Sequence, residues 1–307
     1  MSTKRRKWMA QSLGDKLFDV INFIVLILLA GICLYPLYYI VVVSFNKTPY
    51  GSFLWPNDFT LEGYKMVLGD SNLWIAYRNT IFYAVGGVCF SLCLTVPCAY
   101  ALSRKDLPGK KIFTLYLLVT MFISGGMIPT YLTVQKLHLL NTWIVVIIMT
   151  GVSAYNIIVA RTFFATTIPD ELLDASRIDG CGNGGFLLKV VLPLSKSILA
   201  VLALWIGVGR WNSYFTELLY LRDEVKQPLA MYLRKVLWQV TSLMQMVTSG
   251  GEKGEYVEVT QGMLDKAKLA SIMQYVIIVV ATTPMMIIYP YIQKYFAKGV
   301  MIGSVKG

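Results

Sequence analysis

Long apolar runs alternate with short polar segments along this chain of 307 residues. An apolar run of roughly 20 residues is long enough to cross the hydrocarbon core of a bilayer as a helix. Helices suit such runs because they satisfy their own backbone hydrogen bonds in lipid. The pattern therefore predicts an all-α polytopic membrane protein with six transmembrane helices. They are expected at Leu17–Val43, Trp74–Leu102, Ile112–Leu132, Thr142–Phe164, Ser197–Leu221 and Leu269–Tyr289.

The polar segments indicate how the chain is organised around these spans. Residues 1–16 are the predicted N-terminal segment, 17–296 the transmembrane domain, and 297–307 the C-terminal tail. Two longer polar segments interrupt the domain, at 165–193 and at 222–268. The first apolar run is about twice as long as the apolar part of a signal peptide, so we expect a retained transmembrane helix.

Composition supports a membrane setting, since 56% of residues are hydrophobic, only 15% are charged and the mean hydropathy is +0.59. A soluble domain carries about 25% charged residues. When the N-terminus is placed in the cytoplasm, 16 of the 28 lysines and arginines fall on the cytoplasmic side. Lys and Arg are enriched in cytoplasmic loops. Both termini and the segment 165–193 are therefore predicted to be cytoplasmic, and 222–268 to be extracytoplasmic.

The net charge of +11 does not indicate a nucleic-acid partner. The basic clusters flank the spans, where they meet anionic lipid headgroups. Five cysteines lack metal-type spacing to the one histidine, His138, so no metal site and no disulfide are predicted. We therefore expect the basic residues to contact membrane lipid.

The predicted cytoplasmic segment is glycine-rich yet patterned as two short helices. Thr167 is expected to cap the first helix, with Pro169 as its first residue. Gly180 is expected to end that helix in a left-handed conformation, before further glycines reverse the chain. A second apolar piece begins at Phe186, and Pro193 opens the next span. The product is a compact knob at the membrane face, shaped to enter a groove of another protein.

Leu172, Ala175 and Ile178 recur on one face of the first predicted helix. Such a narrow apolar face fits a partner protein. An interfacial amphipathic helix, lying on the membrane surface, is the alternative on shape alone.

The spacing within this segment favours a partner protein. Asp174, Ala175 and Ser176 are followed after three residues by Gly180, and after nine more by Val-Val-Leu and Pro193. This order closely resembles the EAA loop of binding-protein-dependent ABC importer permeases, in which Glu-Ala-Ala precedes the glycine. Asp174 stands where that family usually has Glu, and Ser176 replaces the second Ala. Both departures affect the expected contact with an ATPase.

Other motifs extend the resemblance over most of the chain. These motifs are typical of sugar permeases. They are most similar to those of the maltose-type second permease, in the branch that handles complex or acidic oligosaccharides. The matching segments are Arg78-Asn79-Thr80, Gly126-Met127-Ile128-Pro129-Thr130-Tyr131, Leu139-Leu140-Asn141-Thr142, Arg210-Trp211-Asn212, Pro228-Leu229, Lys294-Tyr295-Phe296 and Lys298-Gly299.

The resemblance implies a type I ABC importer fold in a bacterial cell membrane. It implies four kinds of partner: a second permease, two cytoplasmic ATPase subunits that bind ATP and Mg, an extracytoplasmic solute-binding protein and lipid. The chain has no phosphate-binding loop, so it is expected to be neither an enzyme nor the carrier of a cofactor. The residues expected to couple it to the ATPase are Asp174, Ala175, Ser176, Asp179, Gly180, Phe186 and Pro193.

The substrate pathway is expected near the end of the fifth span. Arg210 and Glu217 lie two helical turns apart, and such residues are costly in lipid, so they should face the interior or water. The candidate pathway residues are Arg210, Trp211, Asn212 and Tyr214. Alternatively, the span ends near Val208 and these residues lie at the outer interface, where aromatic belts are common.

The segment 222–268 is the largest predicted extramembrane piece. Pro228 can start an amphipathic helix in which Leu229, Leu233 and Val236 share a face with Leu237. The resemblance implies contact with the binding protein here, whereas a plain connecting loop is the alternative.

Two other functions stay open at this stage. An ABC permease for a non-sugar solute would have the same cytoplasmic segment. An ion-coupled secondary transporter would have broken helices, but it would normally have repeated halves and acidic residues within its spans. The centres of spans one to four and six contain no Asp or Glu, which disfavours the secondary transporter.

Overall fold

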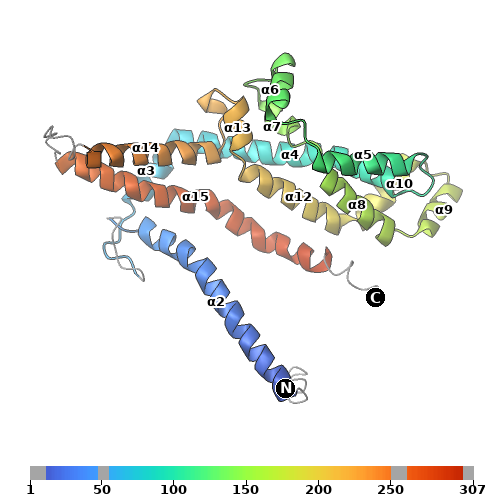
Figure 1. Cartoon of the computed structure of the whole chain (residues 1–307), viewed down its shortest axis with the longest axis horizontal. Coiled ribbons are helices and arrows are strands. Elements are labelled where there is room, and N and C mark those ends of the chain that lie inside the picture. Colours follow the sequence, from blue (N-terminus) through green and yellow to red (C-terminus); the bar gives the residue numbers. More distant parts are fainter. Residues whose placement is uncertain (1–11, 48–54, 250–260, 300–307) are drawn as a thin grey trace. The chain divides into compact units, whose positions relative to one another are not determined.

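A computed structural model of the chain describes residues 12–47, 55–249 and 261–299. In these residues helices account for the regular structure, and the one β element is an isolated antiparallel bridge between Asn46 and Phe59. Figure 1 shows the helices in sequence colours. By their internal contacts they divide into two compact units, 1–67 with 237–280 and 68–236 with 281–307. The mostly helical fold is as predicted. Parts of the predicted N-terminal segment, outer loop and C-terminal tail lie outside the described residues.

The first unit contains α2 (Leu13–Ser44) and most of α3 (Glu62–Gly69). Ser12 and Asp15 form a capping box at the start of α2, in which each side chain accepts a hydrogen bond from the other's backbone. The most apolar stretch of α2 has no buried residue. Such a helix fits a lipid environment, as the sequence predicts for the first span.

The α2–α3 connection is held by aromatic contacts within the first unit. The Phe45 ring stacks on Phe59 at 5.5 Å and on Tyr64 at 5.0 Å between centroids. The hydroxyls of Ser44 and Tyr64 are hydrogen-bonded at 2.7 Å. These contacts fix the end of α2 against α3.

The second unit is built around the long helix α4 (Ser71–Ser103). Its remaining elements are α5 (Lys110–Phe122), α6 (Met127–Lys136), α7 (Trp143–Ile148), α8 (Ala154–Thr167), α9 (Asp170–Ile178), α10 (Asn183–Phe186), a π turn (Leu187–Val191), α11 (Leu192–Leu194), α12 (Lys196–Trp211), α13 (Phe215–Tyr220) and a 3-10 turn (Glu224–Lys226). Two further helices, α14 (Leu229–Ser249) and α15 (Gln261–Gly299), continue from one unit into the other.

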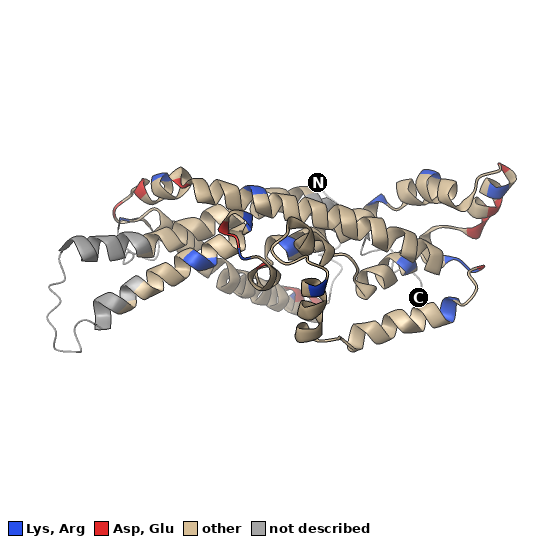
Figure 2. Ribbon diagram, turned by 90° about the horizontal axis from the view of Figure 1, so that it is seen from above, with Lys and Arg blue, Asp and Glu red and all other residues tan. Residues whose placement is uncertain are grey.

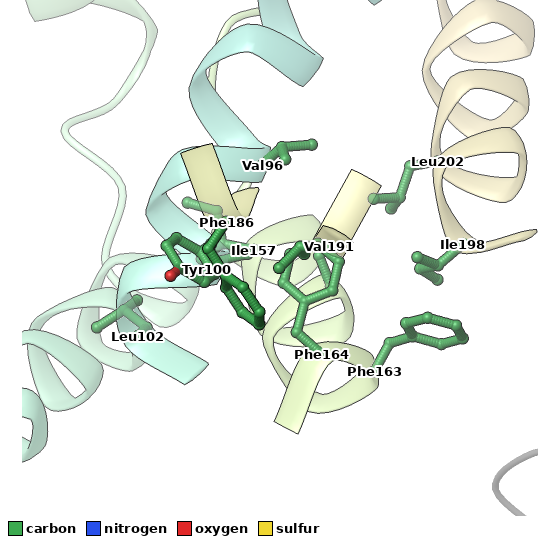
Figure 3. Close-up of a cluster of buried hydrophobic side chains, with 12 residues drawn as sticks. Val96, Tyr100, Leu102, Ile157, Phe163, Phe164, Phe186, Val191, Ile198 and Leu202 are labelled. Carbon is green, nitrogen blue, oxygen red and sulfur yellow. The ribbon is translucent and has the colours of Figure 1, made fainter. Parts of the chain in front are cut away.

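Helices α8 and α12 pack along α4, and α9 and α10 lie at the end where α4 terminates (Figure 1). A cluster of buried apolar side chains lies where α4, α8, α10 and α12 meet (Figure 3). The cluster comprises Val96, Ala99, Tyr100, Leu102, Ile157, Ala160, Phe163, Phe164, Phe186, Val191, Ile198 and Leu202. Burial of this surface fixes α8, α10 and α12 on α4.

Within the described residues, three helices are individually long and apolar enough to cross a membrane: α2, α4 and Ser271–Tyr291 of α15. They match the first, second and sixth predicted spans. Two bent pairs bring the count to at most five if each pair is one span. Helices α5 and α6 are bent by 109°, and the α10–α11 segment and α12 are bent by 82°. The α5–α6 bend lies between Phe122 and Met127, in a segment that contains Gly125 and Gly126.

The fourth predicted span is not a single helix. It is divided into α7 and α8 by a break that contains Gly151. A Cβ atom on Gly151 would lie 2.9 Å from the Phe90 ring and 3.0 Å from the Ile148 carbonyl oxygen. A side chain larger than that of glycine would be crowded at this break. Six membrane crossings stay a prediction.

The fifth predicted span is also divided. Helix α12 ends at Trp211, close to the Val208 limit of the shorter alternative, and α13 follows after a break. The predicted span Ser197–Leu221 was therefore too long.

Candidate functional site

The start of α9 differs from the prediction. Thr167 is the last residue of α8, and Pro169 is the N-cap of α9 in an extended conformation, with φ −64° and ψ 146°. The residue before a proline is driven out of the helical region by contact with the proline ring. Ile168 is extended for this reason, so α8 ends and the cap moves from Thr167 to Pro169.

The end of α9 is as predicted. Gly180 has φ +72°, a left-handed conformation that favours glycine. The Cys181 N–H donates to the Ser176 carbonyl at 2.8 Å, and the Gly180 N–H donates to the Arg177 carbonyl at 3.0 Å. These two hydrogen bonds form a Schellman motif, which satisfies the last carbonyl groups of the helix.

Gly182, the next glycine after Gly180, does not have a left-handed backbone. Gly182 has φ −73° and caps α10 in an extended conformation. Gly185 is needed for space, because a Cβ atom there would lie 2.7 Å from the Cys181 sulfur. The predicted reversal therefore depends on Gly180 and Gly185.

Most predicted coupling residues lie on the surface of the α9–α10 knob. Helix α9 buries none of its residues. Ile178 is 87% exposed and Leu172 is also exposed, so the predicted apolar face is uncovered in the described structure. Leu173 lies on the opposite side and packs against the buried cluster. The exposed predicted residues are Asp174, Ala175, Asp179, Gly180 and Pro193.

Two predicted coupling residues face the protein. Phe186 is 2% exposed, and its ring centroid lies 6.3 Å from that of Tyr100 (Figure 3). The Ser176 hydroxyl donates to the Leu173 carbonyl at 2.7 Å. Phe186 therefore anchors the knob, and serine at position 176 is accommodated by a hydrogen bond within its own helix.

Asp106, in the loop between α4 and α5, bridges two arginines. Arg104 donates to its two carboxylate oxygens at 2.9 and 2.6 Å, and Arg177 of α9 donates to one of them at 2.7 Å. Lys105 and Asp170 form a second ion pair, at 2.5 Å. Acidic and basic residues accordingly gather at the α9 end of the second unit (Figure 2). Both pairs join the loop to α9.

Asp106 and Lys105 keep their charges near neutral pH. Hydrogen bonds from Arg104 hold the pKa of the Asp106 carboxyl well below its usual range. A lowered carboxyl pKa gives a stabilisation that is present above the unfolded pKa and is lost only as pH falls through the folded value. The hydrogen bond to Asp170 raises the pKa of Lys105, and its contribution is lost only as pH rises through that raised value.

The other end of α4 holds the chain segment 222–229 through buried polar groups. Asn79 is fully buried, and its amide donates to the carbonyls of Val225 at 2.7 Å and Gln227 at 2.9 Å. Thr80 accepts a hydrogen bond from the Leu229 N–H at 2.7 Å. The Arg-Asn-Thr motif thus fixes the start of α14.

Further hydrogen bonds hold the same segment. The Tyr83 hydroxyl donates to the Lys226 carbonyl at 2.9 Å. The Lys226 ammonium donates to the Asn141 carbonyl at 2.7 Å. The Asn141 side chain accepts from the N–H groups of Arg222 and Asp223, both at 3.1 Å. Segment 222–229 is therefore fixed to α4 and to the α6–α7 connection.

Arg210 and Glu217 form an ion pair at 3.5 Å across the α12–α13 break. Glu217 is 1% exposed and also accepts from the Ser213 hydroxyl at 2.9 Å. Arg210 donates to the Val146 carbonyl at 3.3 Å. The prediction that the two residues lie two turns apart on one helix was wrong, because α12 ends at Trp211 and α13 begins at Phe215. The break between the two helices brings them together.

The other predicted pathway residues surround this break. The Trp211 indole donates to a carbonyl of α15 at 3.3 Å. Asn212 and Tyr214 are exposed, and the Arg234 guanidinium lies 5.8 Å from the centre of the Tyr214 ring. Arg210 is engaged by protein groups, so the accessible polar surface at this break belongs to Asn212 and Tyr214.

The predicted amphipathic helix after Pro228 is present as α14. Leu229 is buried and Leu233 and Val236 are half-buried, whereas Arg234 and Lys235 are exposed. The predicted contact with a binding protein is not tested by this arrangement. Residues 250–260 of the same predicted loop lie outside the described part of the chain.

Sequence reasoning missed the ion pairs that join α9 to the α4–α5 loop and the contacts of Asn141 with segment 222–229. It counted Arg104 and Lys105 only as basic residues that orient the chain, and it did not consider Asp106. Opposite charges in the loop at 104–106 and in α9 were the available signal. The contact between Asn141 and segment 222–229 could not be predicted from sequence, because it forms only when distant parts of the chain fold together.

Comparison with known proteins places this geometry in a family. The model of the family described as "Binding-protein-dependent transport system inner membrane component" matches residues 72–302. The polygalacturonan/rhamnogalacturonan transport system permease protein YtcP of Bacillus subtilis is 35% identical, over 95% of this chain and 99% of that protein. The arabinooligosaccharides transport system permease protein AraQ of Halalkalibacterium halodurans is 27% identical, over 82% of this chain and 81% of its own length.

A solved structure is similar over nearly the same length. It is the crystal structure of a bacterial ABC transporter involved in the import of the acidic polysaccharide alginate. One of its chains matches with a TM-score of 0.81 and 34% identity, over 93% of this chain and 99% of that chain. The likeness therefore covers both the fold and the sequence.

Proposed function

The chain belongs to the family of binding-protein-dependent transport system inner membrane components, and we propose that it is one permease subunit of an ABC importer for oligosaccharides. It forms half of the pathway in a bacterial cell membrane. A second permease completes the pathway, two ATPase subunits drive it with ATP and Mg, and an extracytoplasmic binding protein delivers the substrate.

The observation that carries this proposal is the α9–α10 knob. Its residues have the spacing of an ATPase-coupling loop, and they fold as a helix whose apolar face is uncovered. Leu172 and Ile178 would enter a cleft of the ATPase, while Phe186 holds the knob on α4. Apolar anchors that fill a partner's pocket are typical of such helix-in-groove contacts.

The proposed substrate class is an acidic oligosaccharide. The relatives at 34 and 35% identity include proteins named for polygalacturonan and for alginate import. Both polymers consist of uronic acids, which carry a carboxylate on each sugar. The match to an arabinooligosaccharide permease is weaker, at 27%.

We assign the pathway surface to Asn212 and Tyr214, with Trp211 as support. An exposed amide can hydrogen-bond sugar hydroxyls, and an aromatic face can pack on a sugar ring. Arg210 contributes by holding the break in place, since its guanidinium is already paired with Glu217.

Reconstitution tests the proposal. The chain is purified with its partner permease and ATPases, placed in liposomes with the binding protein, and supplied with oligogalacturonates, alginate oligomers and maltotriose. We expect ATP-dependent uptake of an acidic oligomer and little uptake of maltotriose. Uptake of maltotriose alone would reject the acidic substrate class. An assembled complex that takes up none of the sugars would reject the oligosaccharide function.

A further inference from the structure

Asp106 lies between the end of α4 and the coupling helix. It accepts hydrogen bonds from Arg104, next to the last residue of α4, and from Arg177 in the last turn of α9. Both bonds reach the same carboxylate oxygen, at 2.6 and 2.7 Å. Charge-assisted hydrogen bonds of this length fix the geometry of the groups that they join, although this pair is half exposed and adds little stability. One carboxylate therefore connects the two helices.

We propose that Asp106 is a positioning residue that fixes the direction of α9 and passes its motion to α4. This role rests on the proposed function of α9 as the ATPase-coupling helix. Asp106 touches neither substrate nor nucleotide in the proposal, and it acts through Arg177.

Few other contacts orient α9. The helix buries none of its residues. Within the helix only Leu173 packs against the buried cluster, with Ile168 before α9 and Cys181 after it. One apolar contact within the helix gives little resistance to a small rotation of α9 about its axis. The ion pairs to Asp106 and from Lys105 to Asp170 oppose that rotation at the two ends of the helix.

The loop that carries Asp106 is itself fixed. The Lys110 ammonium donates to the carbonyls of Ser103 at 3.2 Å and Arg104 at 2.9 Å. The Arg104 guanidinium donates to the Tyr100 hydroxyl at 3.3 Å and lies 5.8 Å from the centre of its ring. A force on Arg177 is thus transmitted through Asp106 and Arg104 to the body of α4.

A cavity of about 270 Å³ lies between α9 and this loop. Arg104, Asp106, Leu173 and Arg177 are among its lining residues. The cavity gives α9 room to move once its ion pairs are broken, because no packed side chains fill that space. Loss of Asp106 should therefore loosen α9 without opening the buried cluster.

The test compares D106N, D106E and R177Q in the complete transporter. We expect D106N and R177Q each to lower sugar transported per ATP hydrolysed by about fivefold, a typical effect of weakening a coupling contact. The double variant should be no worse than either single variant, because both remove the same contact. D106E should keep most of the coupling, since it retains the carboxylate.

Lys111→Gln is the matched control, since it removes an exposed charge from the same surface and leaves the Asp106 contacts intact. It should transport as the wild type does. Unchanged transport per ATP in D106N would overturn the proposal. So would a D106N defect limited to the amount of assembled complex, or additive losses in the double variant.

Hydrogen exchange of residues 170–180 in the purified permease separates this proposal from the proposed function. D106N should speed exchange there about fivefold, whether or not the wild type transports a sugar. Equal exchange in D106N and wild type would overturn the positioning role. Failure of the wild-type complex to take up oligosaccharide would instead reject the proposed function.

Discussion

The two ends of α4 hold their neighbours by different means. At the α9 end, Asp106 and Arg177 pair while their side chains are 52% and 51% exposed. Toward the opposite end, the buried Asn79 holds segment 222–229. Near the middle of α4, beside Gly87, the buried Glu217 pairs with Arg210. Exposed pairs are screened by water and contribute little stability, whereas a buried polar group that loses its partner is costly.

The exposed ion pairs can break and re-form, whereas the buried polar contacts are fixed. A helix that moves with a partner protein needs contacts that can re-form in water. A segment that sets the shape of a pathway needs contacts whose loss is strongly unfavourable. Substitutions at the buried end should therefore affect stability, and those at the exposed end should affect coupling.

The largest stability effect is expected for Glu217→Ala. It leaves the Arg210 guanidinium without its carboxylate partner at the α12–α13 break. Removing one member of a buried ion pair costs about 3–5 kcal/mol. Thermal unfolding of the purified permease complex should show this loss.

The double variant Arg210→Met with Glu217→Leu is the control for this prediction. Replacing both charges with apolar residues of similar volume should restore most of the stability, because no unpaired charge is left. If it is stable and also transports, Arg210 serves the break and does not contact substrate. A double variant as unstable as Glu217→Ala would contradict the ion-pair explanation.

Asn79→Ala should have the next largest effect. It leaves the carbonyls of Val225 and Gln227 without their donor, and an unsatisfied buried polar group costs about 1–3 kcal/mol. Hydrogen exchange should increase in residues 222–229 and stay unchanged in α9. Equal increases at both ends would show that the ends of α4 are not held independently.

Gly180→Ala should destabilise the knob by about 1 kcal/mol, because alanine is strained at φ +72°. Gly182→Ala is the matched control, since its φ is −73° and its Cβ position is open. It should stay within about 0.5 kcal/mol of the wild type. Stability of the two variants is compared by thermal unfolding, and equal losses would contradict the role of the left-handed turn.

The sequence predicted the features that depend on local chemistry. The long apolar spans α2 and α4, the left-handed Gly180 and the amphipathic start of α14 all follow from composition and spacing within a few residues. The Glu217 and Arg210 charges were recognised as unusual for the same reason. These features could be predicted because the residues that determine each of them lie within one helix or turn.

The parts that the sequence did not predict depend on tertiary contacts. The break at Gly151 lies where the Phe90 ring of another helix packs closely against the chain, and no pattern within the span predicts that contact. The Asp106–Arg177 pair joins residues distant in the chain, and the Arg210–Glu217 pair forms only once the helix breaks between them. The cap of α9 was missed because Ile168, preceding a proline, ends α8 early.

Ile178→Ser should have the smallest effect on stability and a large effect on assembly. The side chain is 87% exposed, so its replacement should change the free energy of unfolding by no more than about 0.5 kcal/mol. It removes an apolar anchor of the proposed ATPase contact, so less ATPase should co-purify with the permease. Leu188→Ser is the matched control, because Leu188 is an exposed apolar residue of the same knob outside the α9 face. If both variants retain the ATPase equally well, the uncovered face of α9 is not the docking surface, and the exposed end of α4 loses its assigned role.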